Sequence, residues 1–169
     1  DESDQLTFAS NAVLLERHLN DVKNEAGRLA AELNLDADKT VALETAAVWH
    51  DVGKAHHVFQ SMLQTANLEM DKSKFWAKSR TETCDACGRL KWKRTAYGRK
   101  HFRHELASAL AWLNNSAGRI DSDLIAYLVA AHHGKVRLLL RSMPGETKPS
   151  DGAPYARGIW TGDVLPAVP

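Results

Sequence analysis

The chain lacks the features that would place it in a membrane or in an extracellular disulfide framework. No apolar run approaches the roughly 20 residues that a membrane-spanning helix needs. Two cysteines form a single CxxC pair, which excludes a disulfide framework and favours a cytoplasmic location. The start is acidic and polar, unlike a secretory signal, and has no initiator methionine, so we expect a processed chain or a piece of a longer one.

Prolines and strand patterns are also scarce. All five prolines lie at or beyond Pro144, so long helices are permitted before that residue, and no alternating pattern of useful length predicts a strand. The 169 residues, 44% of them hydrophobic, suit one domain with a core. Asp38 and Asp121 are expected N-caps, and Gly134 is an expected helix stop. Helical spacing predicts helices over residues 11–34, 38–50, 55–65, 104–115 and 121–132.

These segments predict an all-α domain over residues 1–143. A polar, basic insertion at residues 66–100 separates its helices, and residues 144–169 form a Pro/Gly-rich, irregular tail that we expect to lead into further sequence.

Charge is scarce in net terms, at +1, but it is unevenly distributed. Residues 72–104 hold 11 Lys and Arg against two acids, whereas the rest of the chain holds 11 basic against 19 acidic side chains. This excess indicates a polyanionic partner, with a solvated basic loop as the alternative. Interleaved aromatic residues favour stacking on single-stranded nucleic acid; they are Phe75, Trp76, Trp92, Tyr97 and Phe102. The candidate contacts are Lys91, Trp92, Lys93, Arg94, Arg99 and Lys100.

Histidine, by contrast, is abundant, with eight residues. His50 and Asp51 end one apolar segment just before a glycine, and His132 and His133 end another. His18 alone would be typical of a core residue, and His104 alone of a helix cap, but together they predict a metal site. Imidazole and carboxylate suit Mn, Fe, Co, Ni or Zn better than Mg. The six candidate ligands are His18, His50, Asp51, His104, His132 and His133.

Asp51 has two oxygens and is able to bridge two cations. Two such cations activate a water molecule and bind a phosphate oxygen, which promotes in-line hydrolysis of a phosphate ester. Lys54 is close enough in sequence to neutralise charge that develops on the phosphate. His56 and His57 are weaker candidates for groups on the substrate side.

The motifs resemble those of the HD phosphohydrolase superfamily, and in particular the CRISPR-associated HD nucleases that act with the type I interference helicase. Residues 50–60 resemble the signature HD-x-G-K-x-x-x-x-F-Q. Residues 103–109 resemble R-H-E-x-x-S-A, and residues 131–134 resemble A-H-H-G. His18 resembles the first histidine of the family. The resemblance spans about residues 11–140.

This resemblance implies an HD-type helical bundle that cleaves single-stranded DNA exposed by a crRNA-guided surveillance complex. A helicase, fused or separate, would feed the strand into the site. Two ions of Mn, Fe, Co or Ni are implied, one held by His18, His50 and Asp51. Asp51, His104, His132 and His133 would hold the other, with Lys54 near the scissile phosphate. The family's late acidic or hydroxyl ligand has no helical counterpart here, so we expect it beyond Pro169.

Several alternatives remain open at this point. The site would also suit an HD phosphohydrolase of small nucleotides, or a non-catalytic HD docking module. Endonuclease or exonuclease character, and DNA or RNA preference, are not encoded in any motif. Cys84 and Cys87 offer only two of the four ligands of a structural zinc, so they are either loop thiols or part of a zinc knuckle completed by His101 or another residue.

Overall fold

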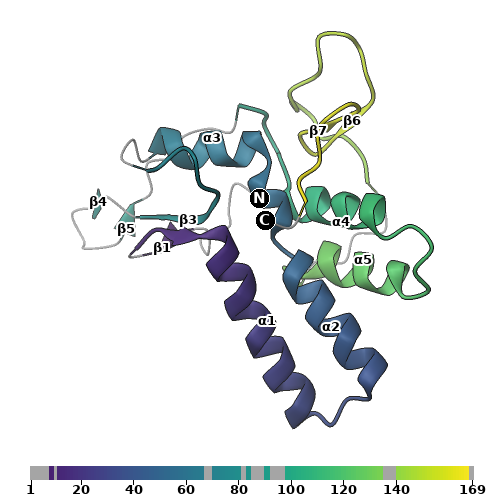
Figure 1. Ribbon diagram of the computed structural model, residues 1–169. Helices are drawn as coiled ribbons and strands as arrows, with labels where there is room; N and C mark the ends of the chain where they lie inside the picture. Colours follow the sequence, from purple (N-terminus) through teal and green to yellow (C-terminus); the bar gives the residue numbers. More distant parts are fainter. Residues whose placement is uncertain are drawn as a thin grey trace.

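The structure, a computed structural model, is mostly helical, as predicted, and Figure 1 shows how its helices are arranged. It describes residues 8–9, 11–66, 70–80, 83–84, 90–91, 98–134 and 140–167. The helices are α1 (Leu15–Glu32), α2 (Ala37–Trp49), the short 3-10 helix η2 (Val52–Ala55), α3 (His57–Ala66), α4 (His104–Asn115) and α5 (Ser122–Ala131). The strands are β1 (Phe8–Ala9), β2 (Val13–Leu14), β3 (Trp76–Arg80), β4 (Thr83–Cys84), β5 (Leu90–Lys91), β6 (Tyr155–Ala156) and β7 (Ile159–Trp160).

Helices α1 and α2 pack side by side as a helical hairpin. The inner stripe of α1 buries Leu15, Leu19, Ala26 and Ala30, which recur at helical spacing. The N-cap of α2 is Asp36, whose carboxylate accepts the backbone N–H of Lys39 at 2.8 Å. The expectation that Asp38 caps this helix is therefore wrong, because the extended backbone needed at a cap lies two residues earlier.

Helices α4 and α5 pack on each other and on α2. Their shared core is formed mainly by small or aliphatic side chains, with the Trp112 ring meeting that of Trp49 edge to face. This packing brings the C-terminal end of α5 and the N-terminal end of α4 near the end of α2. Within the described residues, no helix is long and apolar enough to cross a bilayer.

A three-stranded sheet in the order β1-β3-β2 flanks α1 and α3, although the sequence predicted no strand. Strand β3 buries Ala77 and Ser79 and leaves Trp76 and Lys78 partly exposed. Buried and partly exposed side chains do alternate along β3. Because the buried ones are small or polar, the sequence shows no alternating hydrophobic pattern.

Gly53 allows η2 to lie directly against α4. A Cβ on Gly53 would be 2.0 Å from the carbonyl oxygen of His104 and 2.7 Å from the backbone nitrogen of Ser108. The Gly53 N–H also donates to the Ser108 hydroxyl at 2.7 Å. Only glycine fits this approach, and the contact sets the distance between Asp51 and His104.

Gln60 joins η2, α3 and β3. Its side-chain amide donates to the carbonyl oxygens of Lys54 at 2.7 Å and Trp76 at 2.9 Å, and its own oxygen accepts the Trp76 N–H at 3.1 Å. Because Gln60 is buried, these three bonds satisfy backbone groups that water does not reach. They fix the segment that follows His50 and Asp51.

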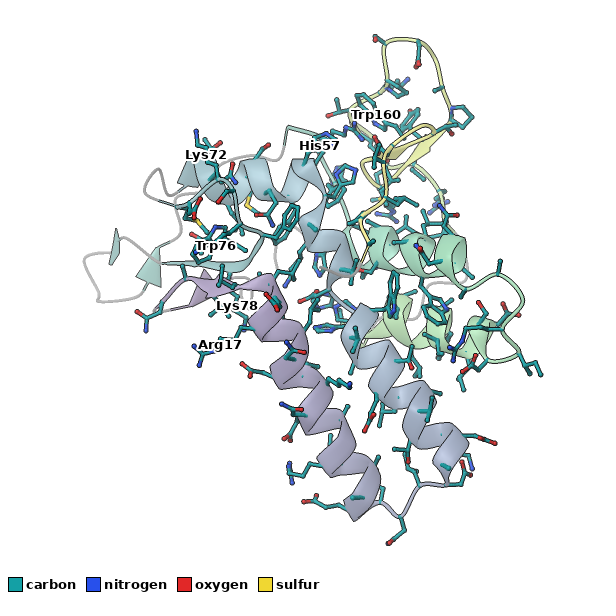
Figure 2. All side chains as sticks on the ribbon, in the orientation of Figure 1. Arg17, His57, Lys72, Trp76, Lys78 and Trp160 are labelled. Carbon is teal, nitrogen blue, oxygen red and sulfur yellow. The ribbon has the colours of Figure 1, made fainter. Side chains whose placement is uncertain are left out.

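The C-terminal segment packs on α4 and on the start of α3. Arg103 donates its backbone N–H to the Arg157 carbonyl at 3.0 Å. Gly158, with φ +73°, lies so close to Phe102 that a Cβ would approach within 2.5 Å of its Cα. Figure 2 labels Trp160 in this segment and His57 at the start of α3. The proposed boundary at residue 143 stays a prediction.

Candidate metal centre

Six side chains from four helix ends converge, and Asp51 lies at their centre. His18 lies in the first turns of α1, and His50 and Asp51 directly follow α2. His104 begins α4, and His132 and His133 follow α5. These residues form two groups whose potential ligand atoms lie within 4.8 Å of one another: His18, His50 and Asp51 in the first, His104, His132 and His133 in the second.

The two oxygens of Asp51 face different histidines. Its Oδ2 lies 2.9 Å from His18 Nε2 and 3.3 Å from His50 Nε2. Its Oδ1 lies 3.1 Å from His104 Nε2 and 3.6 Å from His132 Nε2. His133 Nε2 in turn lies 3.0 Å from His104 Nε2. The carboxylate therefore stands between the two groups.

Backbone carbonyls orient two of these imidazoles. His50 Nδ1 lies 2.6 Å from the Ala47 oxygen, and His132 Nδ1 lies 2.7 Å from the Val129 oxygen. Both histidines follow a helix C-terminus, where carbonyl groups lack helical partners. In a neutral imidazole that donates from Nδ1 to the carbonyl, Nε2 is the nitrogen with the free lone pair, and in both residues it is directed at Asp51.

The electrostatics of the site favour an anionic Asp51 and a neutral His104, whereas at His132 the lowering of the pKa by burial is outweighed by the hydrogen bond to Asp51 and its charge, which raise that pKa. Burial would raise the pKa of Asp51, but Lys54 and the nearby His104, His132 and His18 lower it well below its usual range. Burial lowers the pKa of His104 from 6.5 to about 4. At neutral pH Asp51 is therefore an anion and His104 a neutral imidazole.

Lys54 is inside the site rather than on its surface. Its side chain is 4% exposed, and its Nζ lies 2.7 Å from Asp51 Oδ2. The ammonium also lies over the Phe59 ring, 5.6 Å from the ring centroid. Lys54 is thus the counter-ion of Asp51, and it compensates a buried negative charge.

A divalent cation fits this set of side chains. Asp51 Oδ1 and His132 Nε2 are buried and have no hydrogen-bond partner among the described residues. Leaving such atoms unsatisfied costs about 1–3 kcal/mol each, and a bound cation would satisfy both. A mixture of imidazole and carboxylate suits a borderline transition metal.

Comparison with protein families explains why these side chains occur together. The family described as "Cas3, HD domain" matches residues 7–158, which is most of the chain. The chain belongs to this family. Comparisons with curated proteins and with solved structures find no match.

Membership confirms the resemblance seen in the motifs and the all-α HD fold. It makes this HD domain a metal-dependent nuclease of a CRISPR system, with nucleic acid as its substrate and divalent metal as its cofactor.

The predicted nucleic-acid contacts lie in different environments. Lys91 lies in β5, and Trp92, Lys93 and Arg94 lie outside the described residues, as does Cys87. Cys84 lies in β4, and its side chain is not described, so the zinc alternative stays a prediction. Lys100 is exposed.

Arg99 is held within the fold. Its guanidinium binds Asp163 Oδ2 at 2.5 Å and lies over the Trp160 ring, 3.7 Å from its centroid. Among the aromatic residues expected to stack on nucleic acid, Phe102 is fully buried in the core. That expectation is wrong for Phe102.

His56 and Asp163 lie beside each other, outside the two histidine groups. His56, a weak candidate for the substrate side, is buried against Phe102 and lies 3.4 Å from Asp163. Asp163 is engaged by Arg99 and by the Trp160 N–H rather than by the histidine groups. A further ligand beyond Pro169 stays a prediction.

Several residues that build the site have no role predicted from the sequence. Gly53, Gln60 and Ser108 were quoted only as parts of motifs, yet their contacts hold η2 against α4 and β3. Glu105 was quoted in the same way. The motif spacing indicated that these residues matter. Spacing alone does not show which backbone groups a side chain contacts.

Proposed function

We propose that this HD domain hydrolyses phosphodiester bonds of single-stranded DNA with two divalent transition metal ions, in CRISPR type I interference. The observation that carries the proposal is the placement of Asp51, whose Oδ2 faces His18 and His50 while its Oδ1 faces His104 and His132. A carboxylate between two ligand groups is what a bridging ligand requires.

In this proposal, His18, His50 and Asp51 hold one ion, and Asp51, His104, His132 and His133 hold the other. Bound ions of Mn, Fe, Co or Ni would supply Lewis-acid chemistry, activating water and neutralising phosphate charge. Lys54 supplies a further fixed positive charge beside Asp51, in a buried setting where charge interactions are strong.

Cationic side chains in the same half of the molecule as α1 support a strand as substrate rather than a free nucleotide. Arg17 precedes His18 in α1, and Lys78 of β3 pairs with Val13 next to that helix. Figure 2 shows Arg17, Lys72 and Lys78 in the half of the molecule built from α1, α3 and β3. Lys72 and Lys74 are exposed there, as is the ring of Phe75. A helicase domain and a surveillance complex are the proposed partners that deliver the strand.

Cleavage of circular single-stranded DNA in Mn, Co, Ni, Mg or EDTA tests the proposal, with duplex and dinucleotide substrates in parallel. We expect cutting of the circle in a transition metal, inhibition by EDTA, and at least a 100-fold loss in Asp51→Asn. A circle has no ends, so its cutting identifies an endonuclease, whereas cutting of linear strands alone identifies an exonuclease.

The alternatives give different results in the same assay. Hydrolysis of the dinucleotide alone would indicate a phosphohydrolase of small nucleotides. Strand binding with no hydrolysis in any metal would indicate a docking module. Cutting that survives EDTA, or that is unchanged in Asp51→Asn, would contradict the metal mechanism.

A further inference from the structure

Glu105 is a buried carboxylate beside the metal centre that the proposed chemistry leaves without a role. Its side chain is 3% exposed and lies in the first turn of α4, one residue after His104. Arg103 donates from Nε to Glu105 Oε1 at 2.5 Å, and its Nη2 binds the same oxygen. This ion pair fixes one oxygen of the carboxylate and leaves the other, Oε2, on the side of His104.

Two complementary atoms face each other across a short gap. His104 Nδ1 and Glu105 Oε2 lie 3.8 Å apart. Both atoms are buried, and neither has a hydrogen-bond partner among the described residues. A rotation of the carboxylate that shortens this distance by about 1 Å would complete a hydrogen bond.

The position of His104 explains why a side chain is needed here. His50 and His132 follow helix C-termini and use backbone carbonyls as acceptors for Nδ1. His104 instead begins α4, where the backbone groups without helical partners are N–H donors. The carbonyls of that turn accept helical N–H groups, as that of Arg103 accepts the N–H of Ala107, so a carboxylate is the suitable acceptor. A negative charge in the first turn is also favoured by the helix dipole.

We propose that Glu105 is a positioning residue that accepts the Nδ1 proton of His104 and thereby presents His104 Nε2 to the metal group formed with His132 and His133. The inference rests on the proposed function only in that His104 is a ligand there. Carboxylates in this position fix the imidazole tautomer and make the ligand more basic. The motif R-H-E thus supplies an ion-pair anchor, a ligand and its acceptor in three successive residues.

Nitrogen-15 NMR of the imidazoles in the metal-free protein tests the contact directly. Asp51 Oδ1, 3.1 Å from Nε2, and Glu105 Oε2 compete for the proton of the neutral His104 ring, so we expect Glu105→Ala to shift the tautomer balance of the wild type toward Nε2. Glu105→Gln has a single oxygen, and because Arg103 binds the oxygen, the amide nitrogen faces His104 Nδ1 and should shift the balance toward Nε2 as Glu105→Ala does. Glu146→Ala is the matched control, because Glu146 is also buried but accepts the backbone N–H groups of Met143 and Gly158.

Calorimetric titration with Mn²⁺ or Co²⁺ measures the consequence. Glu105→Ala should weaken binding by about 10- to 100-fold, Glu105→Gln by a similar factor, and Glu146→Ala little. An unchanged tautomer and unchanged affinity in Glu105→Ala would overturn the inference. If the wild type bound no metal, the proposed function would fail, and the tautomer of the metal-free protein would still decide whether Glu105 orients His104.

Discussion

At the scale of single residues, Gly53 determines how closely η2 approaches α4. Gly53→Ala would place a methyl group 2.0 Å from a backbone carbonyl oxygen, so the helix must move. We expect a loss of about 2–3 kcal/mol in the free energy of unfolding, with weaker metal binding because His104 shifts away from Asp51. Chemical denaturation and metal titration measure both. Gly98→Ala is the control, since nothing lies within 4 Å of its added methyl group, and equal losses in the two variants would contradict the prediction.

Lys54 is the second residue whose role can be isolated. Lys54→Met leaves the Asp51 carboxylate buried without its cation, and we expect the metal-free protein to lose about 3 kcal/mol of stability. Because a divalent ion supplies the missing positive charge, Mn²⁺ should raise the melting temperature of the variant more than that of the wild type. Lys39→Met removes an exposed pair with Asp36 and should change little. Similar behaviour of the two variants would show that Lys54 is not the counter-ion of Asp51.

The convergence of the six candidate ligands could be predicted because adjacent polar pairs at the ends of apolar helices are unusual for a core. The contacts that hold them could not be predicted. Gly53 and Ser108 are 55 residues apart, and no local pattern joins them. The burial of Lys54 was also missed, because a lysine next to a catalytic motif is equally consistent with a surface position.

At the scale of elements, local patterns predicted helices better than their beginnings or the sheet. The predicted bounds of α4 agree with the structure, since apolar spacing runs through the whole helix. Helix α1 begins four residues later than predicted, at Leu15, because Val13 and Leu14 pair with β3. Strand β3 was missed since its buried residues are Ala77 and Ser79, which carry little hydrophobic signal.

Gln60 is the residue that couples these elements. Gln60→Leu removes three hydrogen bonds and leaves the buried carbonyl of Lys54 without its donor. We expect a loss of about 2–3 kcal/mol and faster hydrogen exchange at the Trp76 amide and in η2. Gln64→Leu, a partly exposed position on the same helix, is the control. Unchanged exchange in Gln60→Leu would mean that packing alone holds η2 against β3.

At the scale of the whole molecule, polar contacts attach the C-terminal segment to the rest of the fold. Amino-acid composition alone does not predict these contacts. Prolines and glycines predicted an irregular tail, yet Asp163 binds Arg99, and Glu146 accepts two backbone N–H groups. Asp163→Asn should cost about 2–3 kcal/mol, since the Arg99 guanidinium is only 12% exposed. Limited proteolysis should then cut residues 140–167 faster, whereas Asp151→Asn, an exposed position, should leave cutting unchanged. Equal proteolysis of both variants would show that the ion pair does not anchor the segment.

His56 links this segment to acid stability. Burial and the charge of His57 lower the pKa of His56 to about 4, against 6.5 in the unfolded chain, and Asp163 only partly offsets this shift. Between these two values the unfolded chain binds a proton that the folded protein excludes. The stabilisation is therefore complete above pH 6.5 and is lost as the pH falls toward 4. Its size is on the order of 3 kcal/mol.

Replacing the imidazole isolates this contribution. His56→Gln should be less stable at pH 7, but its free energy of unfolding should fall less steeply between pH 6.5 and 4 than that of the wild type. Urea denaturation at half-unit steps of pH measures the slope. The control is His101→Asn, since Asn tolerates the left-handed backbone, φ 67°, of that residue. If His56→Gln kept the full wild-type slope, the acid sensitivity would come from other groups. Among the described residues His104 is also buried with a lowered pKa, and adding metal would then suppress its contribution.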